Sequence, residues 1–129
     1  YFTLYKRWHL IGLEVGVSVA SVALRREATG VATCWNADVV ATAKRDLAPG
    51  DLLDGEGGYT VWGKLLPAAT SMQLGALPLG LAHDVKVVRP VRKGQSLSWA
   101  DVAVDTGTRA WQIRQEMEAM FASPQRRAA

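Results

Sequence analysis

Cysteine and histidine are scarce in this sequence, and their scarcity limits both cross-linking and metal binding. The 129 residues include one cysteine, Cys34, and two histidines, His9 and His83. A single cysteine cannot close an internal disulfide, which favours a reducing, cytoplasmic compartment. Their separations match no zinc-binding motif, so no metal site is expected. A catalytic pair of a Cys34 nucleophile and a His83 base stays an alternative, because the members of such pairs are close in the fold and not in the sequence. An ordinary linker or packing role for Cys34 is favoured.

The sequence also lacks an apolar run long enough to cross a membrane. From Leu10 to Leu24 only Glu14 is charged. This run of about 15 residues is shorter than the roughly 20 that a spanning helix needs. Arg25 and Arg26 follow it, where a signal peptide would carry a small-residue cleavage site. We therefore expect neither a membrane partner nor a secretion signal.

A large excess of charge of one sign is absent too. Fifteen Lys and Arg face twelve Asp and Glu, a net charge of +3. Basic residues gather at Lys44–Arg45 and at Arg89–Lys93, but no aromatic side chains stand among them, as they would on a single-strand-binding surface. We therefore expect no nucleic-acid partner. The 49% of apolar residues is enough for the core of one domain.

Residues 1–37 are predicted to form an N-terminal helix and a linker. The segment Thr3–Arg26 has apolar residues at helical spacing, although part of it also alternates as a strand would. Gly12, Gly16 and Ala20 recur every four residues and would form a smooth ridge for close helix packing. Two interpretations of this apolar helix stay open. It is a remnant of an upstream domain, since the sequence does not begin with Met, or it is a core helix of this domain.

Residues 38–105 have the sequence pattern of a small β domain and contain an internal repeat. Short apolar runs alternate with glycine turns, which favours short strands. The shift that places Gly50 on Gly94 aligns the pattern Arg-x-apolar-x-x-Gly-x-x-Leu in both copies. Two such halves can pair about a pseudo-two-fold axis and bury each other's apolar faces, so we predict a mainly β fold with a helix at each end. The aligned pairs are Ala41 with Val85, Ala43 with Val87, Arg45 with Arg89, Leu47 with Val91, and Leu53 with Leu97.

Residues 106–129 are predicted to form a C-terminal helix and a tail. Thr108 is a good N-cap residue, and Pro124 would end the helix. Arg114 and Glu118 are expected to form an exposed ion pair four residues apart. The expected apolar face consists of Ala110, Ile113, Met117, Met120 and Phe121. Five tryptophans are expected to be core or interface anchors: Trp8, Trp35, Trp62, Trp99 and Trp111.

The best candidate for a site is the glycine-rich segment that begins at Asp54. Its glycines lead into a strand-like stretch rather than a helix, so they match neither a dinucleotide fingerprint nor a P-loop. No residue is assigned a catalytic role, and no cofactor is expected on this chain. We expect the polar residues to contact substrate or a neighbouring domain, and Asp54→Ala to leave thermal stability unchanged. The contact candidates are Asp54, Glu56, Tyr59, Lys64 and His83.

The two copies of the repeat resemble the SAF domain. The resemblance rests on Val39–Leu53, with its Arg-Asp-Leu-x-x-Gly-x-x-Leu element, and on Val85–Val102. It covers about half of the chain. What it implies is a β-clip fold of short strands with pseudo-two-fold symmetry.

A narrower resemblance involves Tyr5–Glu14 and Asp54–Leu65. These stretches are similar to the C-terminal part of bacterial NAD(P)-dependent oxidoreductases of the homoserine-dehydrogenase-like kind, including the deoxyxylulose phosphate reductoisomerase-like group. The resemblance implies a non-catalytic accessory domain whose partners are upstream domains of the same polypeptide, a second copy of the chain, and a small polar or sugar-like substrate. NAD(P) would be held by an upstream domain. Two alternatives are a carbohydrate or sugar-acid binding module and a pilus or flagellar assembly chaperone.

Overall fold

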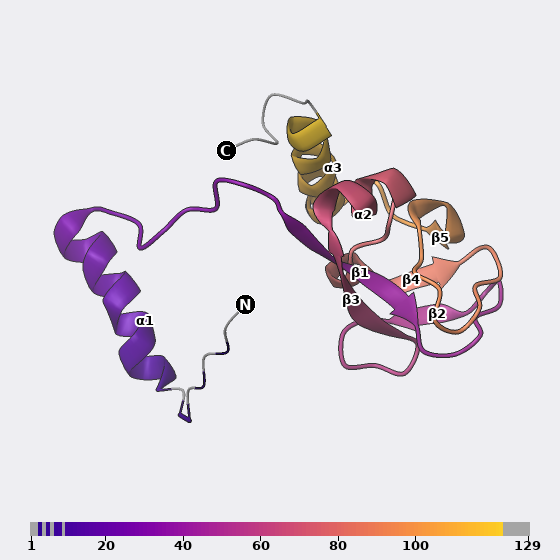
Figure 1. The fold of residues 1–129 in the computed structure, drawn as a ribbon, viewed down its shortest axis with the longest axis horizontal. Helices are drawn as coiled ribbons and strands as arrows, with labels where there is room; N and C mark the ends of the chain where they lie inside the picture. Colours follow the sequence, from indigo (N-terminus) through magenta and orange to yellow (C-terminus); the bar gives the residue numbers. More distant parts are fainter. Residues whose placement is uncertain (1–2, 4, 6, 9, 123–129) are drawn as a thin grey trace. The chain divides into compact units, whose positions relative to one another are not determined.

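The computed structural model describes residues 3, 5, 7–8 and 10–122, and it divides into two units, Tyr1–Thr33 and Cys34–Ala129 (Figure 1). The first unit contains helix α1 (Ile11–Ala20), which continues into the π-helical turn η1 (Ser21–Arg25). The helix predicted from Thr3 thus begins only at Ile11. There the side chain of Glu14 accepts a hydrogen bond from the backbone N–H of Leu10 at 3.2 Å. No helix among the described residues is both long and apolar enough to span a bilayer.

The second unit contains two small antiparallel sheets. In one sheet, β1 (Ala37–Ala43) pairs with β3 (Val61–Pro67) along its whole length. The other sheet has the strand order β2-β4-β5. Its strands are β2 (Leu52–Asp54), β4 (His83–Val87) and β5 (Val102–Ala103).

Helices lie between the strands as well as at the ends of the chain, so the expected mainly β fold is corrected to a mixed fold. Helix α2 (Ala68–Leu74) follows β3 directly and is capped by Gly75, whose φ of +53° lies in the left-handed region that glycine tolerates. These helices between the strands are only three to seven residues long, too short for their apolar residues to show a helical period in the sequence. The helices of the second unit are α2 (Ala68–Leu74), η2 (Leu79–Leu81), η3 (Trp99–Asp101) and α3 (Arg109–Ala122).

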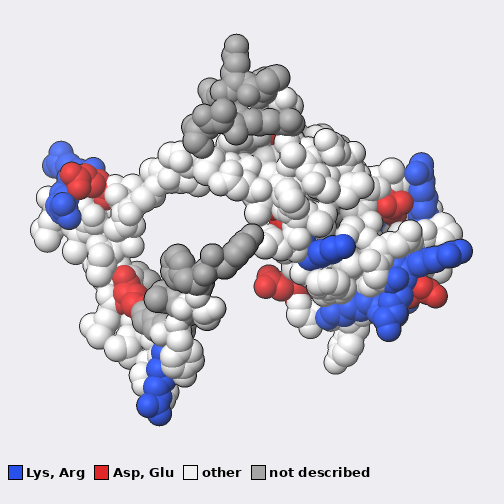
Figure 2. Space-filling view, in the orientation of Figure 1, with Lys and Arg blue, Asp and Glu red and all other residues white. Residues whose placement is uncertain are grey.

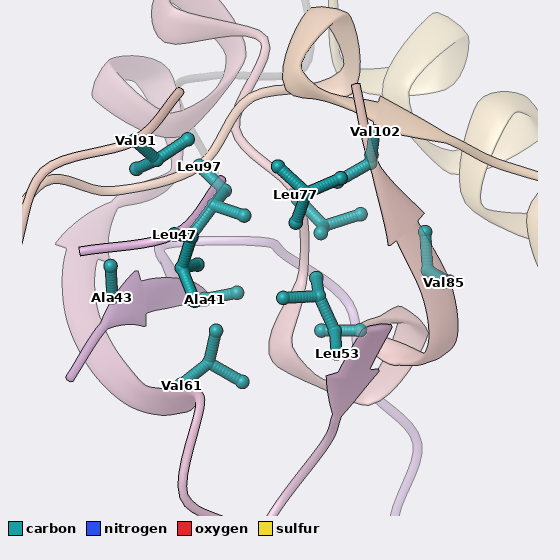
Figure 3. Close-up of a cluster of buried hydrophobic side chains, with 12 residues drawn as sticks. Ala41, Ala43, Leu47, Leu53, Val61, Leu77, Val85, Val91, Leu97 and Val102 are labelled. Carbon is teal, nitrogen blue, oxygen red and sulfur yellow. The ribbon is translucent and has the colours of Figure 1, made fainter. Parts of the chain in front are cut away.

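Both sheets contribute to one hydrophobic core. Figure 3 shows Ala41 and Val61 from the first sheet together with Leu53 and Val85 from the second. Leu77, on the segment that links α2 to η2, is fully buried in the same core. Burying a side chain of this size stabilises the fold by about 1.5–3 kcal/mol, so the shared core holds the two sheets together.

The two copies of the repeat exchange matching hydrogen bonds. Leu47 and Val91, which the repeat aligns, each donate a backbone N–H to the other's carbonyl, at 2.8 and 3.0 Å. The bonds on either side also come in pairs that the same shift relates. Such reciprocal bonding is what a rotation that exchanges the halves produces, and it agrees with the predicted repeat. The pairs are Gly50 N–H to Val87 with Gly94 N–H to Ala43, and Val87 N–H to Asp51 with Ala43 N–H to Gln95.

Helix α3 starts where predicted but faces a different way. The hydroxyl oxygen of Thr108 accepts the backbone N–H of Trp111 at 3.3 Å, which confirms the N-cap. Ile113 and Met120, expected on the buried face, are 50% and 52% exposed, whereas Arg114 is 8% exposed. The inward face is therefore centred on the guanidinium of Arg114. The predicted stop at Pro124 lies outside the described residues.

Candidate functional site

The Asp54 loop (residues 54–60) is closed by the side chain at its first position. The carboxylate of Asp54 accepts the backbone N–H groups of Tyr59, at 2.6 Å, and Thr60, at 3.0 Å, and also the Thr60 hydroxyl. In return, the backbone N–H of Asp54 donates to that hydroxyl oxygen at 3.0 Å. Gly58 lies directly against the carboxylate, since a Cβ there would stand 2.2 Å from Asp54 Cγ. The loop is thus a built structure rather than a flexible polar tip.

These contacts also set the charge of Asp54. The Thr60 hydroxyl and the backbone N–H of Tyr59 lower the pKa of Asp54 from 3.8 to about 2. Asp54 is therefore an ionised acceptor near neutral pH and is unsuited to general acid chemistry. Because the carboxylate makes these bonds, we now expect Asp54→Ala to lower thermal stability, in contrast to the expectation from the sequence.

His83 lies beside this loop. It pairs with Asp54 across the β2–β4 ladder, and Gly55 leaves room for its ring, because a Cβ at Gly55 would stand 2.8 Å from His83 Cδ2. Nδ1 of His83 lies 2.9 Å from a carboxylate oxygen of Asp84. Nε2 has no hydrogen-bond partner among the described residues, so it is the ring atom that is free to meet a ligand or a neighbouring domain.

A cavity of about 370 Å³ adjoins His83. Its polar lining consists of His83, Asp84, Asp105 and Thr108, and its walls come from η2, β4, the end of β5 and the start of α3. Asp84 and Asp105 line this His83 cavity but no Lys or Arg does. Figure 2 shows Lys and Arg gathered on one side of the second unit. The lining suits a group that donates hydrogen bonds, such as a hydroxyl, better than an anion.

The other predicted contact residues divide between two places. Glu56 and Tyr59 are exposed on the Asp54 loop, and Tyr59 is 87% exposed. Lys64 lies on β3 in the other sheet, opposite Val40, and is also exposed. The structure therefore brings Asp54 and His83 together, places Glu56 and Tyr59 in the same loop, and assigns Lys64 to a different sheet.

Sequence reasoning missed a buried polar cluster on the inner face of α3. Arg114 donates two hydrogen bonds to the carboxylate of Asp38, at 3.0 and 2.6 Å, and one to Glu118 at 2.6 Å. Ser71, on α2, donates to the same Asp38 carboxylate at 2.5 Å. The expected pair of Arg114 and Glu118 exists, but the expectation that it is exposed is wrong.

Aromatic side chains complete this cluster. The guanidinium of Arg114 lies 4.6 Å from the centroid of the Trp35 ring, and Trp35 packs edge to face on Phe121 at 6.0 Å. The signal for this arrangement was the helical spacing of Trp111, Arg114, Glu118 and Phe121, which places an arginine between aromatic residues on one face. Burial alone would raise the pKa of Asp38, but hydrogen bonds from Arg114 and Ser71 and the charge of Arg114 outweigh it and lower that pKa.

Within the described ranges, no three His, Cys, Asp or Glu side chains come together as a metal centre requires.

Comparison with known proteins identifies no relative of this chain. No protein-family model matches the chain, and no curated protein matches it.

Proposed function

We propose that this chain is a non-catalytic accessory domain of an NAD(P)-dependent oxidoreductase resembling homoserine dehydrogenase, with a β-clip fold of the SAF kind in its second unit. The proposal is supported by the paired hydrogen bonds of the two repeat halves, which join at Leu47 and Val91. The domain packs on the oxidoreductase body and on a second copy of the chain. The free, exposed thiol of Cys34 fits a reducing cytoplasmic compartment.

The observation that carries this proposal is the exposure of the first unit. Neither α1 nor η1 contains a buried residue. Leu13 is 73% exposed, Val17 is 67% exposed and Leu24 is 84% exposed. A helix that is apolar on several sides is stable only when other protein covers it, so we expect α1 to be an interface element, and in this proposal the covering surface is an upstream domain or a second copy.

The Asp54 loop and the His83 cavity form the surface that this domain offers to the oxidoreductase body. Tyr59 and Glu56 extend from a loop that Asp54 holds in shape, and His83 keeps Nε2 free beside them. A rigid loop that presents exposed side chains loses little entropy on contact. In this role the loop closes the mouth of a substrate site whose catalytic groups and NAD(P) lie on upstream domains, and the substrate is small and polar.

The association of the intact 129-residue chain tests the exposed helix. We expect size-exclusion chromatography with light scattering to show oligomers whose mass rises with concentration. The double variant Leu13→Lys/Val17→Lys should shift this equilibrium toward the monomer, because both side chains are exposed and the charges oppose burial. Val31→Lys is the matched control, since Val31 is 77% exposed but lies outside the helix. A monomer at every concentration would contradict the proposal.

The gene tests the oxidoreductase assignment separately. We expect the reading frame to extend upstream of the codon for Tyr1 and to encode a G-x-G-x-x-G motif between a strand and a helix. A secretion signal directly before Tyr1 would instead indicate the alternative of an exported assembly chaperone.

A further inference from the structure

A second cavity of about 330 Å³ lies between α3 and the segment that runs from η3 through β5. This tryptophan cavity falls within the size range of small-molecule sites, about 300–1,000 Å³. The accessory role proposed above does not require it. Its lining residues are Trp99, Val102, Val104, Thr106, Trp111 and Gln115.

Both walls of the tryptophan cavity are held in place by hydrogen bonds. On one wall, the carboxylate of Asp101 accepts the backbone N–H of Ser98 at 2.8 Å and its hydroxyl at 2.6 Å, and the backbone N–H of Trp99 donates to Gly75 at 2.9 Å. On the other wall, Arg114 fixes α3 to Asp38. The cavity is therefore preformed, and a ligand would not have to order its walls.

The chemistry of the lining limits the ligand. No charged side chain lines the cavity, so a carboxylate, a phosphate or an ammonium group finds no counter-ion there. Trp99 and Trp111 supply indole rings to the lining, and Nε1 of Trp99 is buried with no hydrogen-bond partner in the part of the chain that the structure describes. The polar lining groups are the Thr106 hydroxyl and the Gln115 amide, neither of which bonds another described side chain. Each can both donate and accept.

We propose that the tryptophan cavity binds a neutral sugar ring. The C–H faces of a pyranose pack on indole rings such as those of Trp99 and Trp111, and its hydroxyl groups donate to and accept from Thr106 and Gln115. An apolar aromatic ligand would leave both polar groups unsatisfied, and a sugar acid would bring an unpaired charge. These differences separate a neutral sugar from the other small molecules that would fit by size.

The test is a titration of the full chain with the methyl glycosides of glucose, galactose and mannose. Saturable change in tryptophan fluorescence and ligand-observed NMR report binding. We expect at least one glycoside to bind, and Trp111→Ala to weaken that binding by about tenfold or more. Trp62→Ala should leave it unchanged, because Trp62 is an exposed tryptophan on β3 that does not line the cavity.

Thr106→Val and Gln115→Leu keep the test valid if Trp111→Ala fails to fold. Thr106 is exposed and Gln115 is half-buried, so neither substitution disturbs the core. Each removes a hydrogen-bonding group from the lining, and each should weaken glycoside binding by about threefold or more. Glucuronate and phenol serve as the charged and the apolar comparison ligands. The proposal is overturned if no glycoside binds, if the three lining variants bind as wild type does, or if glucuronate or phenol binds as tightly as the best glycoside.

Discussion

Replacing Arg114 by methionine removes the cation that holds α3 against β1 and α2. Arg114 makes two hydrogen bonds to Asp38, and the two side chains are 9% and 8% exposed. The variant leaves the carboxylate of Asp38 buried without a counter-ion, which costs about 3–5 kcal/mol. The loss of the Trp35 contact adds about 0.5–2 kcal/mol. Since about 1 kcal/mol lowers the midpoint of a domain of this size by roughly 4–8 °C, we expect a fall of at least about 12 °C.

The assay is thermal and urea unfolding, followed by circular dichroism at neutral pH and near pH 4. In wild type the pKa of Asp38 lies below its usual value of 3.8, so the pair stabilises the fold above that value and less as the pH falls through the folded-state pKa. In Arg114→Met the lowering by Arg114 is lost while burial still raises the pKa of Asp38, so that pKa is higher than in wild type, and the destabilisation is complete at neutral pH and is relieved as Asp38 takes up a proton. The difference between the two proteins should therefore shrink on acidification.

Two controls make this result specific. Arg109→Met removes an ion pair with Glu116 on the same helix, but those side chains are 68% and 61% exposed, so we expect a loss below about 1 kcal/mol. Asp38→Leu combined with Arg114→Met should recover most of the stability, because no buried charge remains. A loss below about 1 kcal/mol for Arg114→Met, or a difference that does not change with pH, would refute the reasoning.

Three further predictions concern the Asp54 loop. Asp54→Ala should lower the free energy of unfolding by about 1–3 kcal/mol, because it removes the acceptor of the Tyr59 and Thr60 bonds, while Glu56→Ala changes it by less than about 0.5 kcal/mol. Because the pKa of Asp54 is about 2, the loss of unfolding free energy in Asp54→Ala, measured by urea titration, should be full above pH 3.8 and vanish as the pH falls through 2. A loss that persists at that pH would show that the ionised carboxylate is not its cause. Gly58→Ala should lower the melting temperature, because its Cβ would overlap Asp54, whereas Gly80→Ala meets nothing within 4 Å and should not. Equal melting temperatures for Gly58→Ala and Gly80→Ala would show that the loop can move to accommodate the added Cβ.

The repeat was predictable from the sequence because its signal is local. Glycine at a tight turn, followed at a fixed distance by leucine, recurs in both copies, and a turn dictates where the chain reverses. Gly50 and Gly94 indeed adopt φ values of +97° and +84°, which other residues rarely take. The alternation of small apolar residues before each turn then identifies the buried side of each strand. These features depend on neighbours within a few positions, which a sequence displays directly.

The buried polar cluster was not predictable in the same way because its energy is non-local. Arg114 is 76 residues from Asp38 and 43 from Ser71, and only the folded chain brings their side chains together. An arginine on a helix is ordinarily solvated, so spacing alone assigns it to the surface. The same error placed Ile113 and Met120 on the buried face. One buried ion pair therefore accounts for the rotation of the whole helix relative to the prediction.

Divergence between the two repeat halves explains where the candidate sites lie. The shift that places Gly50 on Gly94 also places Gly55 on Trp99. In the first half, the missing side chain at Gly55 admits the His83 ring, and a glycine-rich loop follows. In the second half, Trp99 stands at the equivalent position of the sequence, begins the short helical turn η3 and lines the tryptophan cavity. The core hydrogen bonds of the two halves match, so the halves diverge after this turn, where the first presents the Asp54 loop and the second presents an aromatic wall.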